Sequence, residues 1–237
     1  MENAGFAALS RQSGLMREMR IVANNIANAA TTGYRQEGLI FSEHVAAVPN
    51  GPSLSMAGAD VHATSMLQGA MSQTGGQFDL AIEGDGFFRV QTPQGERLTR
   101  AGSFTPNGQG DLVTNDGFAV LDAGGAPIFV PPDAHGFSVS ADGTVSANGR
   151  PLTRIGLYQP VDRTGMVRED GVMFRADAGV ELAEGGRIVQ GALEGSNVDA
   201  VGQVARMIEV QRAYEMGQSF LDAENERQRT ALQTIVK

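Results

Sequence analysis

The chain of 237 residues contains no cysteine, no tryptophan and a single lysine, which is its last residue, Lys237. The absence of cysteine excludes disulfides, cysteine-ligated zinc and thiol catalysis. A Walker-type phosphate loop needs a lysine in a glycine-rich turn, and a Schiff base needs a desolvated lysine. A lysine at the last position serves neither role, so several enzyme classes are excluded and no cofactor is predicted.

Long apolar runs and an excess of positive charge are also absent. Residues 1–20 are interrupted by charged side chains and lack the continuous apolar segment of a secretory signal peptide. No run approaches the roughly 20 apolar residues of a transmembrane helix. The net charge of −9 disfavours nucleic acid and anionic membranes as partners, because both need a basic surface. We expect no nucleic-acid partner, no membrane span and, for an exported chain, no cleaved signal peptide.

The histidines are isolated in the sequence. His44, His62 and His135 have no second histidine or carboxylate at the spacing of a helical metal site. We therefore predict surface or half-buried histidines and no metal site.

Four carboxylates in the middle of the chain, Glu83, Asp85, Asp111 and Asp116, are the candidates for chemistry. Paired carboxylates can act as acid and base or bind calcium. Aspartate beside glycine is, however, an ordinary turn signal, and no stretch has EF-hand spacing. Turn chemistry is the preferred interpretation, and no catalytic residue is predicted. A carbohydrate-active enzyme using Glu83, Asp85 and Asp111, and a lectin-like module, remain the competing classes.

Proline and glycine divide the chain into three parts. All nine prolines lie between Pro49 and Pro160, and most of the 31 glycines follow Gly75. The ends therefore favour helices and the middle is rich in turns. We predict an α+β fold, with terminal α-helices forming a coiled-coil-like helical domain and a β-rich central domain. The expected bounds are 1–40 for the N-terminal helical part, 41–75 for an extended connector, 76–190 for the β-rich domain and 191–237 for the C-terminal helical part.

Apolar residues at a seven-residue spacing predict a helix from residue 3 to about residue 30. Gly33 stands where the end of a helix favours a left-handed residue. The two apolar series are Leu9, Met16, Ala23 and Ala30, and Met19 and Ile26.

The C-terminal end has a similar but incomplete stripe from Val198 onward. Ser196 or Asn197 is expected to be its N-cap. Four amides interrupt the stripe, so it buries too little apolar surface to hold a long isolated helix. The apolar positions are Val201, Val204, Met207, Ile208, Tyr214, Leu221, Leu232 and Ile235, and the amides are Gln211, Gln218, Asn225 and Gln228.

Two stretches of the middle predict β-hairpins. In residues 78–91, "EGDG" separates the apolar-rich segments "FDLAI" and "FFRVQ". In residues 137–147, Gly143 stands at the turn between two alternating segments.

Residues 23–35, "ANNIANAATTGYR", place Asn24, Asn25 and Asn28 at the end of the N-terminal helix. Asparagine is a poor helix former, and a buried amide is costly without a partner. Both terminal helices can pack together, and helices of neighbouring subunits can supply partners for the amides. Packing on the core of the same chain is an equally open interpretation of the pattern.

The same stretch resembles the signature of the axial proteins of the bacterial flagellum, written Ala-Asn-Asn-Leu-Ala-Asn, two variable residues and Thr-x-Gly-Phe-Lys. Ile26, Tyr34 and Arg35 replace Leu, Phe and Lys. Residues 78–121 resemble the central block of the rod and hook proteins, and residues 190–226 resemble their C-terminal block with "LEGSNVD" and "QRAYE". The chain is identified as a member of the flagellar basal-body rod family, most similar to its proximal-rod members; a distal-rod or hook-type subunit is the alternative.

The resemblance implies a structural subunit and no enzymatic activity. Rod subunits stack helically into the shaft that transmits torque from the rotor to the hook. The implied partners are the chain itself, other rod subunits and the flagellar type III export apparatus, and the implied location is the basal-body rod in the periplasm. The residues expected to make subunit contacts are Leu9, Met16, Met19, Asn24, Asn25, Ile26, Asn28, Thr32, Gly33, Tyr34, Asn197, Val201, Val204, Ile208, Gln211, Tyr214, Gln218 and Leu221.

Overall fold

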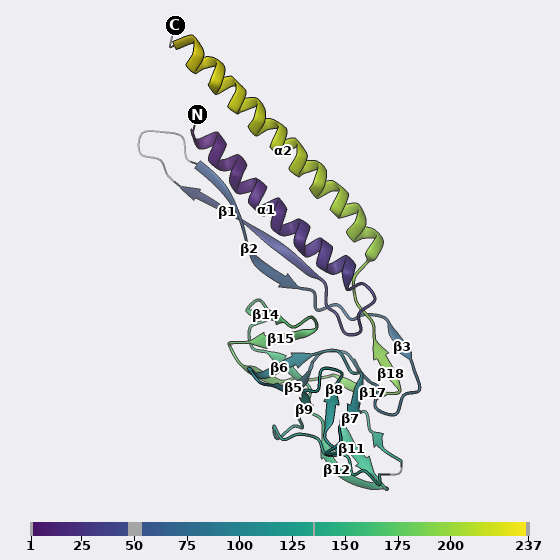
Figure 1. Ribbon diagram of the computed structural model, residues 1–237. Helices are drawn as coiled ribbons and strands as arrows, with labels where there is room; N and C mark the ends of the chain where they lie inside the picture. Colours follow the sequence, from purple (N-terminus) through teal and green to yellow (C-terminus); the bar gives the residue numbers. More distant parts are fainter. Residues whose placement is uncertain (1, 47–53, 135, 236–237) are drawn as a thin grey trace. The chain divides into compact units, whose positions relative to one another are not determined.

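The computed structural model describes residues 2–46, 54–134 and 136–235 (Figure 1). The chain divides into two compact units, each assembled from segments that are distant in sequence. The helical unit comprises Met1–Ala27, Glu37–Ala63 and Asp199–Lys237, and the β unit comprises Asn28–Gln36 and Thr64–Val198. A helix at each end and many antiparallel strands between them confirm the predicted α+β class.

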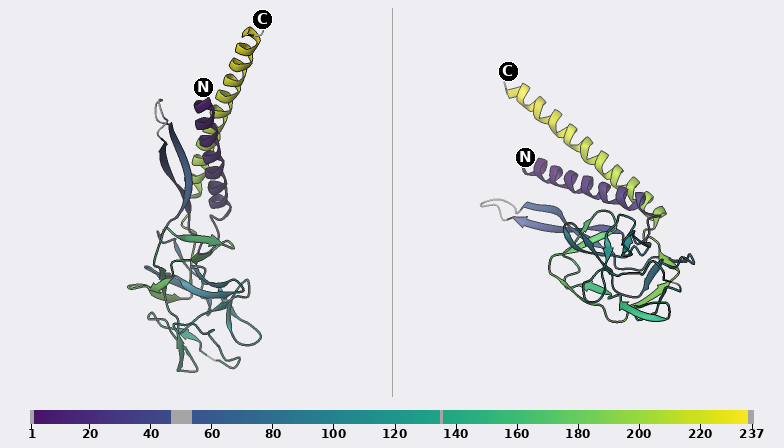
Figure 2. Two further views of the ribbon diagram at one scale, coloured as in Figure 1. Left: turned by 90° about the vertical axis from the view of Figure 1, so that its left-hand side faces the viewer. Right: turned by 60° about the horizontal axis from the view of Figure 1, so that its bottom comes forward.

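In the helical unit, α1 (Glu2–Ala27) and α2 (Ala200–Ile235) lie side by side and antiparallel (Figure 1, Figure 2). α1 also contacts β1 (Glu37–Ala46), which pairs with β2 (Leu54–Thr64) in a two-stranded sheet. Within residues 41–75, for which we predict an extended connector, the described residues 41–46 and 54–64 are extended and belong to these two paired strands. Pairing satisfies backbone groups that a lone extended segment would leave to water.

α1 packs through a face that the seven-residue spacing did not identify. Ile21 and Val22 are 5% and 4% exposed, whereas Leu9 and Met16 of the predicted seam are 57% and 44% exposed. The packed face of α1 mixes apolar side chains with polar ones that have partners inside the chain, and subunit contacts through Leu9 and Met16 stay predictions. The spacing instead marks a face of α1 that the chain leaves exposed.

α1 ends at Ala27, slightly before the predicted end. Gly33 has a φ of +70°, the left-handed conformation predicted for it, but it lies in the following loop. Gly33 is therefore not the C-terminal cap of the helix, and its conformation serves that loop.

Asp199 caps the start of α2. Its Oδ1 accepts a hydrogen bond from the Val201 amide at 3.2 Å, and its carbonyl accepts one from the Gln203 amide at 2.9 Å. The predicted caps Ser196 and Asn197 precede this position and belong to the β unit. The N-cap prediction is wrong because Asp199 competes successfully for the same role.

The β unit consists of short antiparallel strands joined by tight turns. Its largest sheet has the order β14-β15-β6-β5-β9-β8-β7. The bounds are β14 Met166–Glu169, β15 Met173–Ala176, β6 Gly95–Thr99, β5 Phe88–Thr92, β9 Ala119–Val120, β8 Leu112–Thr114 and β7 Phe104–Pro106.

Smaller sheets complete the β unit. They are the three-stranded sheet of β10 (Ser138–Val139), β11 (Thr144–Ala147) and β12 (Arg150–Arg154), and three pairs: β13 (Tyr158–Pro160) with β16 (Val180–Leu182), β17 (Arg187–Gln190) with β4 (Leu80–Glu83), and β18 (Ala192–Glu194) with β3 (Met71–Gln73).

The two predicted hairpins have different outcomes. β10 and β11 pair across a turn in which Gly143 has a φ of +89°, which confirms the hairpin in residues 137–147. The hairpin in residues 78–91 is wrong: Ile82 of β4 lies opposite Ile188, and Phe88 of β5 lies opposite Thr99. A strand that is buried on both faces, as β4 is, carries no local signal of its partner.

The β unit has a well-buried apolar core. Phe88 is fully buried and makes an edge-to-face pair with Phe104, with ring centroids 5.3 Å apart. Side chains in the same cluster with no exposed surface are Leu80, Ile82, Phe88, Val90, Leu112, Val120, Ile128 and Val145. Each such side chain stabilises the fold by about 1.5–3 kcal/mol relative to exposure, so this unit carries its own hydrophobic core.

Candidate subunit-assembly site

The loop that follows α1 and the segment that precedes α2 meet within the β unit. The Gly33 amide donates to the Glu194 carbonyl at 2.8 Å, and the Asn197 amide donates to the Tyr34 carbonyl at 3.2 Å. A Cβ on Gly33 would lie 2.3 Å from the backbone nitrogen of Ala101, so the position requires glycine. The predicted assembly positions in these two segments are therefore brought together by contacts inside one chain.

A buried ion triad joins the two segments, and we call Arg35, Glu194 and Arg100 the latch. Arg35 Nη2 lies 3.0 Å from Glu194 Oε1, and Arg100 Nη1 lies 3.0 Å from Glu194 Oε2. The three side chains are 1%, 1% and 3% exposed. The Gly69 amide also donates to Glu194 Oε1 at 2.9 Å. One carboxylate thus holds two guanidinium groups and a backbone amide away from water.

The latch carries two cations for one anion. Burial, followed by repulsion from Arg100, lowers the pKa of Arg35 to about 10, while Glu194 acts in the opposite direction. Burial likewise lowers the pKa of Arg100. Arg100 Nη1 donates to the Ile82 carbonyl at 3.2 Å, and Arg100 Nη2 donates to the Gly84 carbonyl at 2.7 Å. Both arginines stay cationic at neutral pH, so the structure depends on Glu194 and these carbonyls.

Tyr34 lies under a third arginine. The guanidinium carbon of Arg168 is 4.2 Å from the centre of the Tyr34 ring and 4.7 Å from that of Phe174. Arg168 Nη2 also donates to the carbonyl of Arg35. Tyr34 is 2% exposed, so its side chain is used within the β unit. A subunit contact through Tyr34 stays a prediction, and this burial gives it no support.

Asn197 connects three segments of the β unit through its side chain. Its Oδ1 accepts from the Gln36 amide at 2.6 Å, and its Nδ2 donates to the Leu67 carbonyl at 2.7 Å. The Nδ2 also lies 3.3 Å from Ser65 Oγ. These hydrogen bonds explain why Asn197 does not cap α2, and they give it a role inside the chain; its subunit contact stays a prediction.

Asn25 pairs with the backbone of β1 as a peptide group would. Its Nδ2 donates to the Glu37 carbonyl at 2.7 Å, and its Oδ1 accepts from the Glu37 amide at 3.0 Å. The Nδ2 also donates to Gln203 Oε1 at 3.1 Å. Asn25 is 1% exposed and joins α1 to both β1 and α2. The partners of these hydrogen bonds lie in the same chain, and a subunit contact through Asn25 stays a prediction.

The other signature asparagines have different surroundings. Asn28 is half-buried, and its Oδ1 accepts from Thr31 Oγ1 at 3.1 Å in the turn after α1. Asn24 is exposed on α1, and Thr32 is half-buried in the loop. Subunit contacts through Asn24, Asn28 and Thr32 remain predictions.

An ion pair and a hydrogen bond join α1 to α2. Arg206 Nη2 lies 2.6 Å from Glu18 Oε1, and this hydrogen bond is the main cause that raises the pKa of Arg206. Gln12 Nε2 donates to the Tyr214 carbonyl at 3.1 Å. The sequence analysis did not identify these contacts, because polar residues on a helix usually mark its solvent face.

Large apolar side chains on the two helices are exposed. Val201, Val204 and Ile208 are 81%, 48% and 46% exposed and, at spacings of three and four residues, form one stripe along α2. We call this the α2 stripe. Other exposed apolar residues of the helical unit are Leu9, Met16, Met216 and Phe220. Of the remaining predicted assembly residues, Met19, Ile26, Tyr214 and Leu221 are half-buried, and Gln211 and Gln218 are exposed.

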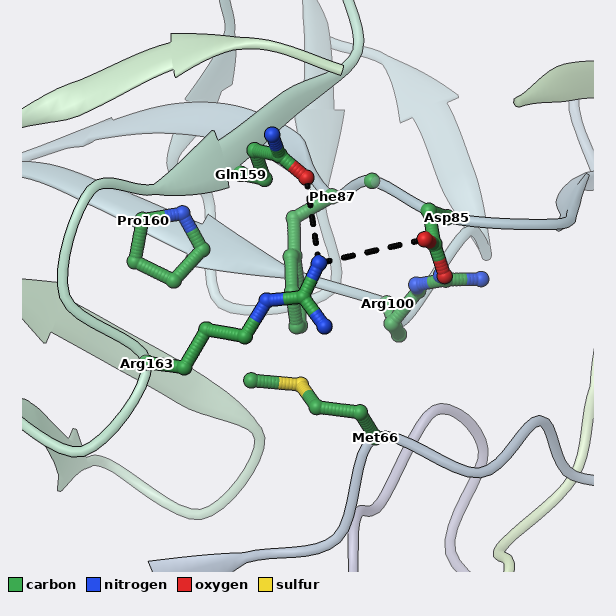
Figure 3. Close-up of a pocket in the computed structure, with 8 residues that line it drawn as sticks. Met66, Asp85, Phe87, Arg100, Gln159, Pro160 and Arg163 are labelled. Carbon is green, nitrogen blue, oxygen red and sulfur yellow. Dashed lines mark hydrogen bonds and ion pairs between the residues drawn. The ribbon is translucent and has the colours of Figure 1, made fainter. Parts of the chain in front are cut away.

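The candidate catalytic carboxylates form surface ion pairs. Asp85 borders a pocket of only about 10 Å³, where Arg163 Nη2 lies 3.9 Å from Asp85 Oδ2 and 3.4 Å from Gln159 Oε1 (Figure 3). This volume suits about one water molecule and does not admit a sugar ring. Glu83 pairs with Arg187 at 2.6 Å, and both side chains are exposed.

The other candidates for chemistry lie in turns or outside the described structure. The amide of Asp111 donates to Asn107 Oδ1 at 2.9 Å, within a turn. His135 lies outside the described residues, as do the side chains of His44 and His62. Among the described residues, no three histidine, aspartate or glutamate side chains gather as a metal site would require. No helix in the described ranges combines the length and apolarity that crossing a membrane requires.

The latch residues were missed as functional candidates. Glu194 and Arg100 lie in the resembling blocks, but buried charges are rare and their partners are distant in sequence. The available signal was a lone carboxylate at the end of the short apolar strand β18.

The two units define a class of protein. The β unit buries its own core. It also includes and hydrogen-bonds the two chain segments that lead to the helices, residues 33–36 and 194–197. The helices, in contrast, expose apolar side chains. A chain built in this way is a structural subunit of a larger assembly.

Family comparisons agree with this class. Residues 7–35 match a family described as flagella basal body rod protein. Residues 81–147 match the flagellar hook protein FlgE/F/G D1 domain, and residues 189–234 match the flagellar basal body rod FlgEFG protein C-terminal region. The three matches overlap the three sequence blocks of the resemblance, in the same order.

Full-length relatives give the same assignment. The chain is 40% identical to the flagellar basal-body rod protein FlgF of Caulobacter vibrioides, over 100% of this chain and 99% of that protein. It is 33% identical to FlgF of Escherichia coli, over 91% of each chain, and 31% identical to FlgG of Bacillus subtilis, over 93% of this chain and 94% of the relative. The chain belongs to the flagellar basal-body rod protein family and is FlgF-like.

Proposed function

We propose that this chain is a structural subunit of the flagellar rod, which assembles helically into the drive shaft between rotor and hook. The observation that carries the proposal is the exposed apolar surface of α1 and α2, on a chain whose other unit buries a complete core. Apolar stripes on helices are the usual contacts of helical bundles, where side chains of one helix fill gaps on the next.

The proposed partners are other copies of this chain and homologous axial subunits of the basal body. An open helical assembly uses heterologous contacts, in which one patch meets a different patch on the next subunit. Leu9 and Met16 on α1 and the α2 stripe supply distinct apolar patches. Export through the flagellar type III apparatus without signal cleavage, and a position in the periplasmic rod, belong to the same proposal.

The chain is proposed to act without catalysis. Asp85 and Glu83 are engaged in surface ion pairs, and the pocket beside Asp85 is too small for a sugar. We expect Asp85→Ala to leave swimming speed unchanged, whereas loss of motility with normal rod incorporation would favour a chemical role for this carboxylate.

A complementation experiment tests the structural role. The gene is deleted in its host, and the chain or a variant is supplied in its place. Swimming and the amount of the chain in purified basal bodies are measured. The double variant Val204→Asp, Ile208→Asp is expected to reduce incorporation at least tenfold, because it places charges in the proposed contact. Leu182→Asp in the β unit, where Leu182 is 63% exposed, is the matched control. Equal incorporation of both variants would contradict the proposal.

A further inference from the structure

α1 and α2 border a hollow of about 560 Å³. Its walls are mostly apolar, with Leu15 from α1 and Met216 and Phe220 from α2. Met216 and Phe220 are 67% and 52% exposed, so these walls are open to an occupant. We call this hollow the helix groove. Its volume exceeds that of any single large side chain, so several side chains are needed to fill it.

Gln12, which lines the groove, has a buried polar atom without a partner among the described residues. Gln12 is 7% exposed, and its Nε2 donates to the Tyr214 carbonyl. Its Oε1 has no hydrogen-bond partner among the described residues. Gly217 allows this placement, because a Cβ there would lie 2.8 Å from Gln12 Nε2. A buried acceptor without a donor is destabilising, so the groove favours an occupant that brings an N–H group.

We infer that the helix groove of one subunit receives the first turns of α2 from a second copy of this chain. The α2 stripe of Val201, Val204 and Ile208 is exposed and continues at Gln211, three residues further along the same face. Gln211 Nε2 donates one N–H to Glu215 Oε1 at 3.1 Å, and an amide nitrogen carries a second. The stripe therefore combines apolar side chains with the donor that Gln12 Oε1 lacks.

Charge is complementary at the edges of these two surfaces. Arg11 lines the groove and is exposed. Glu209, beside Ile208 in the stripe, is 67% exposed at its carboxylate and pairs with Arg206 of its own helix at 3.0 Å. A carboxylate has further acceptor positions, so Glu209 can also receive Arg11 of another copy.

The contact is head-to-tail. The stripe and the groove occupy different parts of α2, residues 201–211 and 213–220. One subunit can therefore bind a neighbour through its stripe and a second neighbour through its groove. Such a contact repeats without closing and generates a helical array. The inference rests on the proposed rod function and specifies which two surfaces of neighbouring subunits meet.

Cysteine cross-linking tests the contact, because the natural chain has no cysteine to interfere. Two differently tagged copies are expressed together in the host, one carrying Val204→Cys and the other Met216→Cys, and intact basal bodies are treated with a short bis-maleimide. A cross-linked dimer with both tags is expected. The control replaces Met216→Cys by Ser219→Cys, an exposed position of α2 outside the described groove lining, and should give at least tenfold less dimer.

The outcomes separate the inference from the proposed function. Absence of both tagged chains from basal bodies would contradict the rod function. Normal incorporation with no dimer, or with equal dimer from the Ser219→Cys control, would overturn the inference and leave the rod function intact.

Gln12→Leu gives an independent readout. It removes the unpaired acceptor and also the hydrogen bond to the Tyr214 carbonyl, and it puts an apolar side chain of similar size in their place. The two effects oppose each other, so the Tm of the isolated monomer should change by no more than a few degrees. Incorporation into basal bodies should fall at least threefold, because the donor of the neighbouring stripe loses its acceptor. A parallel loss of Tm and incorporation indicates a purely structural role for Gln12 and overturns its assignment to the contact.

Discussion

Phe88 in the β unit and Phe220 in the helical unit are the same residue type in opposite situations. Phe88 is fully buried in a cluster of aliphatic and aromatic side chains, and Phe220 is 52% exposed on α2. The β unit buries a large apolar core, although Leu67, Val161 and Leu182 are exposed on its surface. In the helical unit, the exposed apolar side chains follow one another along the helices. The difference assigns monomer stability mainly to one unit and assembly mainly to the other.

Buried polar groups without a partner occur in both units. In the β unit, Glu194 is surrounded by two guanidinium groups and a backbone amide, but the Nε atoms of Arg35 and Arg100 have no partner among the described residues. In the helical unit, Asn25 has several partners, but Gln12 keeps an acceptor without one. The two units therefore differ in the arrangement of their apolar side chains and not in how completely their polar groups are satisfied.

Glu194→Gln is expected to give the largest loss of monomer stability. The side chain keeps its shape, but Arg35 and Arg100 remain buried without an anion. Breaking a buried ion pair in this way costs about 3–5 kcal/mol, and the loss should be near the upper end because two buried cations lose their anion. The free energy of unfolding is measured by urea titration. Glu83→Gln, which breaks an exposed pair, is the control and should cost less than about 1 kcal/mol. Similar losses for both variants would show that the latch does not hold the β unit.

Phe88→Ala and Phe220→Ala test the comparison between the units directly. Phe88→Ala should reduce the free energy of unfolding by about 3–4 kcal/mol, because it leaves a cavity in a packed core. Phe220→Ala should change it by less than about 0.5 kcal/mol, the usual range for surface positions. For equal amounts of folded protein, Phe220→Ala should reduce incorporation into basal bodies more than Phe88→Ala does. Equal effects of the two variants on urea unfolding would invalidate the division of roles.

Asn25→Ala should destabilise the monomer less than Glu194→Gln or Phe88→Ala does. It removes hydrogen bonds to both backbone groups of Glu37 and leaves them partly buried, at a cost of about 1–3 kcal/mol. Gln218→Ala, at an exposed amide of α2, should cost less than about 0.5 kcal/mol. Thermal unfolding of the purified monomer distinguishes them. An unchanged Tm for Asn25→Ala, with poor incorporation, would restore the interpretation that Asn25 contacts a neighbouring subunit.

The sequence was sufficient to predict the overall architecture. The distribution of proline and glycine located both helices, and Gly143 located one hairpin, because these signals are local in the chain. The pairing of β4 with β17 was not predictable in the same way, since Leu80 and Ile82 are buried in a strand with apolar residues on both faces. Long-range pairing depends on which distant segment completes the sheet.

The assembly residues were predicted less well than the architecture. The α2 stripe is exposed, so Val201, Val204 and Ile208 are accessible to another subunit. Their subunit contacts stay predictions. Asn25 and Tyr34 are instead buried in contacts within the chain. A sequence motif indicates that its residues share a role. It does not indicate whether the residues that they contact lie in the same chain or in a neighbouring subunit.

The hydrogen bond from the Gln36 amide to Asn197 spans 161 positions of the sequence. Contacts of such long sequence separation form late in folding, because a large loop must close before they contribute any energy. The segments around Gln36 and Asn197 cannot reach their final environment until most of the chain is present. A chain that emerges with its N-terminus first therefore cannot form this hydrogen bond before Asn197 is present.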